Sequence, residues 1–190
     1  MEDQVMKICQ ACNFHLRNIG KMREHIDEDV TKLLVISFIT SRLDYCNALL
    51  SGCPNHLIER LQKIQNRAAR LITLTKRTEH ITPVLQALHW LPVKYRIDYK
   101  ILCYAFKCLH GSCPSYLQEL VQMYQPSRNL RSSNSLLLRE IPIKSNTSKK
   151  AFSCYAPTLW NSLSPETRSC STFISFKTRL KTELFCRAFY

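Results

Sequence analysis

The most regular helical pattern in the chain is the stretch Leu57-Ile58-Glu59-Arg60-Leu61-Gln62-Lys63-Ile64-Gln65-Asn66-Arg67-Ala68-Ala69-Arg70-Leu71. Its residues 57, 61, 64, 68 and 71 are apolar, and these alternating four- and three-residue steps mark one face of an α-helix. Arg60, Lys63, Arg67 and Arg70 keep the same rhythm on an adjacent face. We therefore predict a helix over residues 57–75, with its apolar side in a core and its basic side in solvent.

Composition extends this helical interpretation to the whole chain. With 190 residues, of which 45% are hydrophobic and 22% charged, the chain is long and apolar enough to bury a core. It has only three glycines, which is few for a β-sandwich or barrel and leaves no pair close enough for a glycine-rich phosphate loop. We predict an all-α fold with about seven or eight helices and one short extended segment near residues 135–143.

Cap and turn residues place the other helices. Gly20 is a candidate stop for a first helix that begins near Val5, and the acidic run Asp27-Glu28-Asp29 is typical of the start of the next helix, over residues 32–50. Asn55 is a candidate N-cap for the helix at 57–75. Prolines and Gly111 delimit the remaining predicted helices, which cover residues 82–88, 93–110, 114–124, 150–163 and 173–189.

The charge of the chain is strongly uneven along its length. The net charge is +13, but residues 1–59 contain six Lys or Arg and eight Asp or Glu, whereas residues 60–190 contain 21 and six. Such a basic segment favours a polyanionic partner, with nucleic acid ahead of an anionic membrane, and a solvated basic surface is the alternative. The longest apolar run, residues 33–39, is too short to span a membrane, and the acidic start lacks a secretory signal. We expect an intracellular protein, in the nucleus or cytoplasm, whose ten cysteines are mostly reduced.

Catalytic chemistry has little support in the sequence. Polymerases and nucleases need clustered carboxylates for two metal ions, and the one acidic cluster, Asp27-Glu28-Asp29, is better explained as helix-terminal charge. Cys9-x-x-Cys12-x-x-His15 lacks the second pair of ligands that a zinc site needs, so we interpret its thiols as core residues. His110 lies near three cysteines, but no glycine-rich turn or orienting acid marks a nucleophile. We predict no enzymatic activity, no catalytic residue, no metal and no cofactor.

Three groups of basic residues are the candidate nucleic-acid contacts. Arg60, Lys63, Arg67 and Arg70 form a linear cationic edge that suits a phosphate backbone. Lys94, Arg96 and Lys100 alternate with Tyr95 and Tyr99, a pattern that can pair with phosphates and stack on bases. Arg128 and Arg131 lie in a loop that could adapt to RNA. For each group, a solvated basic face is the competing interpretation.

Several ordered motifs resemble one known family of polyproteins. They are Phe38-Ile39-Thr40-Ser41-Arg42-Leu43-Asp44-Tyr45-Cys46-Asn47-Ala48-Leu49-Leu50, Leu61-Gln62-Lys63-Ile64-Gln65-Asn66-Arg67-Ala68-Ala69-Arg70, His80-Ile81-Thr82-Pro83-Val84-Leu85, Leu88-His89-Trp90-Leu91-Pro92-Val93, Pro126-Ser127-Arg128, Leu130-Arg131-Ser132-Ser133, Ala151-Phe152-Ser153, Pro157-Thr158-Leu159-Trp160-Asn161-Ser162-Leu163 and Phe176-Lys177. Together they are similar to the polyproteins of LINE-type (non-LTR) retrotransposons, especially the CR1-, L2- and Rex-like lineages, and the resemblance covers nearly the whole chain.

The resemblance implies a region downstream of the reverse transcriptase palm. In that family the palm, with its Ala-Asp-Asp motif, and the endonuclease lie upstream, and this chain contains no Ala-Asp-Asp. Residues 1–77 would be a thumb-like helical segment, followed by a helical continuation (78–125), a basic loop (126–150) and a C-terminal helical pair (151–190). The implied role is non-catalytic binding of RNA or an RNA–DNA hybrid through its backbone.

Two alternatives to this role remain open. The first is a helical protein-interaction module, whose apolar face was once covered by the palm. The second is a translated genomic remnant without a selected function.

Overall fold

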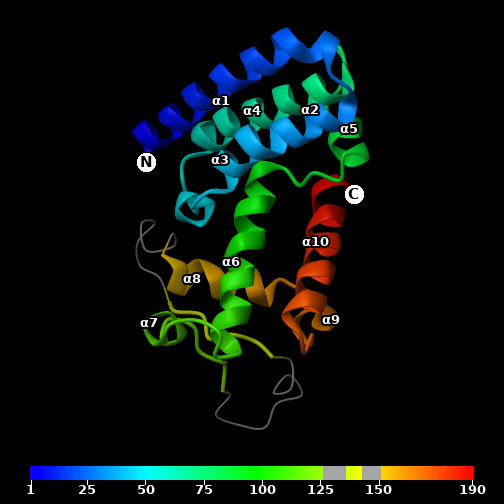
Figure 1. Ribbon diagram of the computed structural model, residues 1–190. Helices are drawn as coiled ribbons and strands as arrows, with labels where there is room; N and C mark the ends of the chain where they lie inside the picture. The colour runs from blue at the N-terminus through cyan, green and yellow to red at the C-terminus, as the bar shows by residue number, and fades with distance from the viewer. Residues whose placement is uncertain (126–135, 143–150) are drawn as a thin grey trace. The chain divides into compact units, whose positions relative to one another are not determined.

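The computed structural model describes residues 1–125, 136–142 and 151–190, and it confirms the all-α class (Figure 1). Compact packing divides the chain into one unit of Met1–Ile97 with Ala188–Tyr190, and a second unit of Asp98–Arg187. The division falls inside the helix α6 (Val93–Leu109), so the two units share a continuous helix. The four segments expected from sequence stay a prediction.

The first unit is built on three helices that lie side by side, α1 (Glu2–Met22), α2 (Glu28–Val35) and α4 (Asn55–Thr73) (Figure 1). Shorter elements connect them. These are the 3-10 turn η1 (Arg23–His25), the π-helical turn η2 (Ile36–Thr40), α3 (Ser41–Asp44) and the 3-10 turn η3 (Asn47–Leu50), and α5 (Thr82–Ala87) follows α4. Val5, Cys12, Leu16 and Ile19 of α1 are buried, which is the one-sided burial that helical spacing produces.

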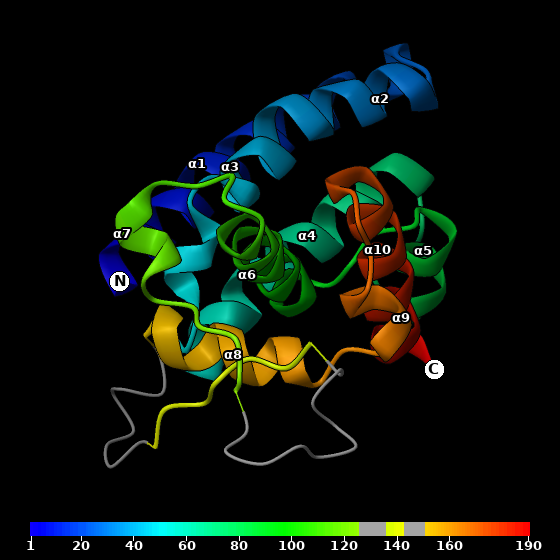
Figure 2. The same ribbon diagram turned by 90° about the horizontal axis from the view of Figure 1, so that it is seen from below.

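In the second unit, α8 (Phe152–Asn161) lies across α6 in both views (Figures 1 and 2), and α10 (Phe173–Phe189) completes the core. The ring centre of Phe176 lies 4.4 Å from that of Phe106 and 5.6 Å from that of Trp160, so one aromatic cluster joins the three helices. Two short helices, α7 (Ser115–Gln118) and α9 (Pro165–Arg168), complete the described elements.

The predicted extended segment lies in this second unit, and residues 136–142 of it are described. Its backbone is non-helical, and Leu138 forms an antiparallel bridge with Met123. The amide of Asn161 receives a hydrogen bond from the Leu138 N–H at 2.8 Å and donates one to the Leu138 carbonyl at 2.9 Å. A side chain of α8 therefore satisfies the backbone that a second strand would otherwise pair with.

Four predicted helix boundaries are wrong. Gly20 does not end the first helix but lies inside α1, where an added Cβ would sit 3.8 Å from Cδ1 of Leu71. The helix expected to reach residue 50 ends at Asp44, because Cys46 takes a positive φ of 50°. Pro54, not Asn55, is the N-cap of α4, and the helix after Pro114 is a single turn.

Candidate nucleic-acid interface

The helix α4 places three of the predicted cations on an exposed face. Four residues of its predicted apolar stripe, Leu57, Leu61, Ile64 and Ala68, are in the core, and Leu71 is half-buried. Arg60, Lys63 and Arg67 are exposed. We call these three residues the α4 basic face. Because the opposite side of the helix is anchored in the core, their backbone positions are fixed relative to one another.

Helix α1 borders this face with polar groups. Nη1 of Arg60 lies 3.9 Å from Oε1 of Glu2, and both side chains are about half exposed, so the pair is weak. Nη1 of Arg67 donates to Oδ1 of Asn13. Lys63 has no ion pair or hydrogen bond to any residue that the structure describes. The guanidinium of Arg67 is therefore oriented by a neutral partner, and Lys63 is free for a ligand.

Arg70 is not part of the α4 basic face, because its guanidinium bonds to the backbone of the protein. Its Nη2 donates to the carbonyl of Glu79 at 2.8 Å, and its Nε to the carbonyl of Lys76 at 3.3 Å. These bonds hold the turn that follows α4. Arg23 does the same for the end of the helix itself, donating to the carbonyls of Leu71 and Ile72. Periodicity places Arg70 beside the other cations, but it gives no signal of these carbonyl acceptors.

The second predicted group is divided by its contacts. Arg96 forms a two-pronged ion pair with Asp44, at 2.8 Å between Nε and Oδ1. Lys94 is exposed. Lys100 is half-buried and belongs to the second unit. Arg96 is thus engaged within the protein, and the three cations do not form a single exposed set.

The tyrosines of this group are also partly enclosed. Tyr95 and Tyr99 are half-buried. Burial, with the neighbouring Cys103, raises the pKa of Tyr99 far above its usual value. A half-buried ring offers little face for stacking on a base. Arg128 and Arg131 lie outside the described residues.

Two glutamine side chains that the sequence did not single out position α6 beside α4. Nε2 of the buried Gln65 donates to the carbonyl of Leu91 at 2.8 Å, and Oε1 of Gln62 accepts from the N–H of Val93 at the same distance. The bond from Val93 satisfies an N–H group that the start of a helix leaves unpaired, and the bond to Leu91 holds the backbone just before α6. The start of α6, with exposed Lys94, is thereby fixed against the middle of α4.

The acidic run and the Cys9/Cys12 pair both make contacts that support the fold. Asp27 is the N-cap of α2, and its Oδ1 accepts from the N–H of Val30 at 2.7 Å. Cys12 is fully buried, and burial raises the pKa of its thiol to about 11 and also raises that of Cys9. His15 stacks on Phe38 with ring centres 4.9 Å apart. Within residues 1–125, 136–142 and 151–190, no three His, Cys, Asp or Glu side chains are grouped to hold a metal ion.

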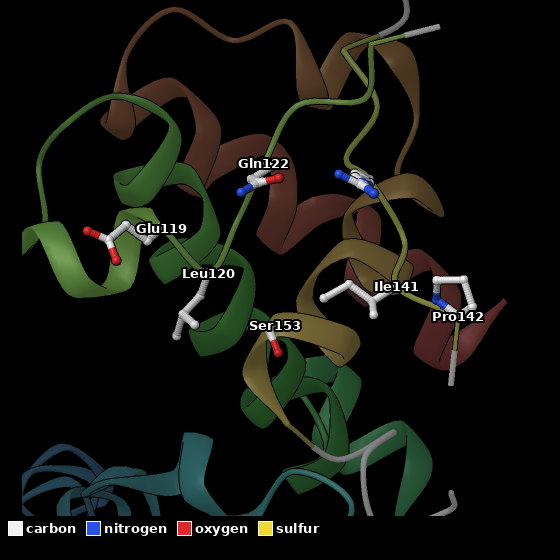
Figure 3. Close-up of a pocket in the computed structure, with 7 residues that line it drawn as sticks. Glu119, Leu120, Gln122, Ile141, Pro142 and Ser153 are labelled. Atoms are coloured by element: carbon white, nitrogen blue, oxygen red, sulfur yellow. The ribbon is translucent and has the colours of Figure 1, made fainter. Parts of the chain in front are cut away.

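A hollow of about 400 Å³ in the second unit contains Glu119, Leu120, Gln122, Ile141 and Ser153 in its lining (Figure 3). The figure shows Glu119 turned away from Ile141, with Ser153 between the two sides. Glu119 is the only carboxylate among the described lining residues, so they lack the paired acids that two-metal catalysis uses. The α4 basic face is the better candidate for a functional surface.

Comparison with protein families, curated proteins and solved structures gives no match to this chain. No described helix is both long enough and apolar enough to cross a membrane.

Proposed function

We propose that the chain is a non-catalytic part of a LINE-type retrotransposon reverse transcriptase polyprotein, downstream of the palm, and that it binds RNA or an RNA–DNA hybrid by its backbone. The family assignment rests on the ordered motifs in the sequence. The observation that carries the binding role is the α4 basic face, where three exposed cations stand on a helix anchored in the core.

The spacing of these cations matches the spacing of phosphates along one strand of a nucleic acid. Arg60 and Arg67 are seven residues apart, which corresponds to about 10 Å along an α-helix. Consecutive phosphates of one strand advance by about 3.4 Å along a duplex axis. The face can therefore span about three phosphates of one strand.

The existing contacts of these cations leave them available to phosphate. The Arg60–Glu2 pair is long and exposed, and such pairs contribute little to stability. Arg67 bonds to the amide oxygen of Asn13 through one nitrogen, which leaves the rest of its donor fork for an anion. Phosphate can thus replace or join these partners without breaking a buried interaction.

A second candidate function, a protein-interaction module, is favoured by an exposed apolar surface on the same unit. Leu33 is 64% exposed and Phe14 is 59% exposed, and Ile36 and Phe38 are exposed as well. His15 lies between Phe14 and Phe38, with ring centres 5.4 and 4.9 Å away. Exposed apolar patches of this kind often mark protein contacts.

One comparison of variants separates the two functions. Replacing Arg60, Lys63 and Arg67 by Gln keeps helix propensity and removes three charges. The matched control replaces Lys7, Arg17 and Lys21, three exposed cations of α1, in the same way. Backbone binding predicts that only the first variant loses RNA affinity in a filter-binding assay. Equal losses of RNA affinity in the two variants would favour the interaction module. The same conclusion would follow if the wild type bound no RNA but formed a stable protein complex that Leu33→Ser abolished.

A further inference from the structure

Arg168, the last residue of α9, is a buried cation. It is only 7% exposed, and its Nε and Nη1 have no hydrogen-bond acceptor among the residues that the structure describes. Arginine side chains are effectively always charged in proteins. Buried charges are normally paired, and an unpaired one is strongly unfavourable. The position therefore indicates an anion that comes from outside the described chain.

Arg168 is one of the residues that line a cavity of about 350 Å³ within the second unit. Among the described residues, His110, Ser169 and Ser171 also line it and are polar. Its apolar wall includes Leu109, Met123 and Trp160. A few polar groups in a mostly apolar cavity of this size are typical of small-molecule sites.

The start of α10 adds to the positive character of this cavity. Ser171 lies directly before Thr172, whose Oγ1 accepts from the N–H of Ser175 at 3.2 Å and caps the helix. A helix of 17 residues carries a partial positive charge at its N-terminus, where anions are favoured. The buried guanidinium of Arg168 and the helix terminus thus act in the same direction.

The nearest acid along the chain does not neutralise Arg168. Glu166 is exposed, and its carboxylate forms no ion pair within the described residues. Its backbone carbonyl accepts from Oγ of Ser169 and from Sγ of Cys170 instead. Arg168 likewise forms no ion pair with any residue that the structure describes.

We propose that this cavity binds the phosphate group of a nucleotide, with Arg168 donating to the phosphate oxygens and the apolar wall packing against the sugar or base. Phosphate matches the planar donor fork of arginine, which can give two parallel hydrogen bonds. The cavity is larger than one phosphate needs, which leaves room for the attached group. The nucleotide is either free or the phosphorylated end of a strand. The α4 basic face belongs to the other unit, so either proposal can fail alone.

Thermal unfolding of the full chain tests this site. The wild type is measured in inorganic phosphate, in adenosine monophosphate, and with oligoribonucleotides that differ only in a 5′-phosphate or 5′-hydroxyl end, against chloride at matched ionic strength. A ligand that binds the folded state raises the unfolding temperature in a saturable way. Arg168→Met removes the charge, Lys181→Met is the exposed control on α10, and His110→Gln is a milder second variant.

The expected result has three parts. Phosphate and the phosphorylated ligands stabilise the wild type and the control, and Arg168→Met weakens this binding roughly ten- to hundredfold. In chloride, Arg168→Met unfolds at a higher temperature than the wild type, because an unpaired buried charge is gone. His110→Gln binds more weakly than the wild type. Tighter binding of the phosphorylated strand than of the free nucleotide identifies a strand end, and the reverse order identifies a free nucleotide.

Two results would overturn the proposal. One is a wild type that phosphate, nucleotide and phosphorylated strand leave unchanged relative to chloride. The other is an Arg168→Met variant that is less stable than the wild type in chloride or fails to fold, because the guanidinium would then have a partner inside the protein.

Discussion

Nε of Arg96 donates to Oδ1 of Asp44 at 2.8 Å, and Nη2 of the same guanidinium contacts Oδ2. The bond joins the end of α3 to the start of α6, across 52 residues of sequence. Oδ1 of Asp44 also accepts from the side-chain amide of Asn47. A paired and oriented guanidinium of this kind stabilises the fold and is unavailable for phosphate.

Arg96→Gln is expected to lower the free energy of unfolding by roughly 1–2 kcal/mol, since the pair is only partly shielded from solvent. Urea unfolding of Arg96→Gln, Asp44→Asn and the double variant measures this coupling. The double variant should lose less than the sum of the single variants. RNA affinity should not change. If Arg96→Gln were as stable as the wild type but bound RNA poorly, Arg96 would be a nucleic-acid contact and not a structural residue.

The carboxyl group of Glu183, in the second unit, should make the stability of the protein sensitive to acid. Burial raises its pKa, but hydrogen bonds from Thr167 and Ser164 and the charge of Arg187 outweigh it, so its pKa lies below the usual value. A carboxyl group with a lowered pKa in the folded state stabilises the protein above its unfolded pKa, and this contribution is lost as pH falls through the folded pKa. The stabilisation should therefore decline below about pH 4.5 and be lost as the pH falls through the lower pKa of the folded state.

The measurement for Glu183 is the unfolding temperature of wild type and Glu183→Gln between neutral pH and pH 3. The wild type should be more stable at neutral pH, and the difference should shrink toward acid. Glu166→Gln is the matched control, because its carboxylate is exposed. A difference that is constant with pH would mean that Glu183 acts by shape and not by charge.

The first acid of the run at residues 27–29 should matter more than its neighbours. Asp27 caps α2 through the N–H of Val30, whereas Asp29 is exposed inside the first turn. Asp27→Ala should cost about 1 kcal/mol of stability, and Asp29→Ala less than about 0.5 kcal/mol. Chemical denaturation measures both. Equal costs would argue against the cap, and a metal-dependent nuclease or polymerase activity lost in either variant would argue against a structural role.

Cys108 and Cys113 are predicted to form a disulfide under mild oxidation. Their sulfurs are 3.1 Å apart across the turn at Gly111, which has a φ of 65°. Burial and the Cys113 thiol raise the pKa of Cys108 to about 12, so the less buried Cys113 should react first with a diazene oxidant such as diamide. Peptide mapping should find this pair ahead of any other. Cys103→Ser is the control, and preferential pairing of other cysteines would contradict the prediction.

The helical class could be predicted from the sequence because burial in this protein follows helical spacing. The stripe at residues 57, 61, 64 and 68 is an example, since its members point to one side of α4 whatever packs there. A helix start at the acidic run 27–29 could also be predicted, because acidic residues are favoured in the first turn of a helix. The N-cap role of Asp27 itself was not predicted. Such local relationships are present in the sequence itself.

The partners of individual cations could not be predicted, because they lie far away along the chain or on the backbone. Asp44 is 52 residues from Arg96, and Arg70 bonds to carbonyl groups that every residue carries. Arg168 had no sequence signal at all, since its burial depends on how α9 packs in the second unit. The prediction from Gly20 was wrong because a glycine can also lie inside a helix, as here two residues before the end of α1.

The salt dependence of RNA binding tests the α4 basic face most directly. Each phosphate contact with a single strand contributes about 0.7 to the slope of log affinity against log salt concentration. Replacing Arg60, Lys63 and Arg67 by Gln should therefore flatten the slope by about 2, with the helical circular dichroism spectrum unchanged. The Lys7, Arg17 and Lys21 control should keep the wild-type slope. An unchanged slope in the α4 variant would show that these cations do not contact the backbone, and would contradict the proposed function.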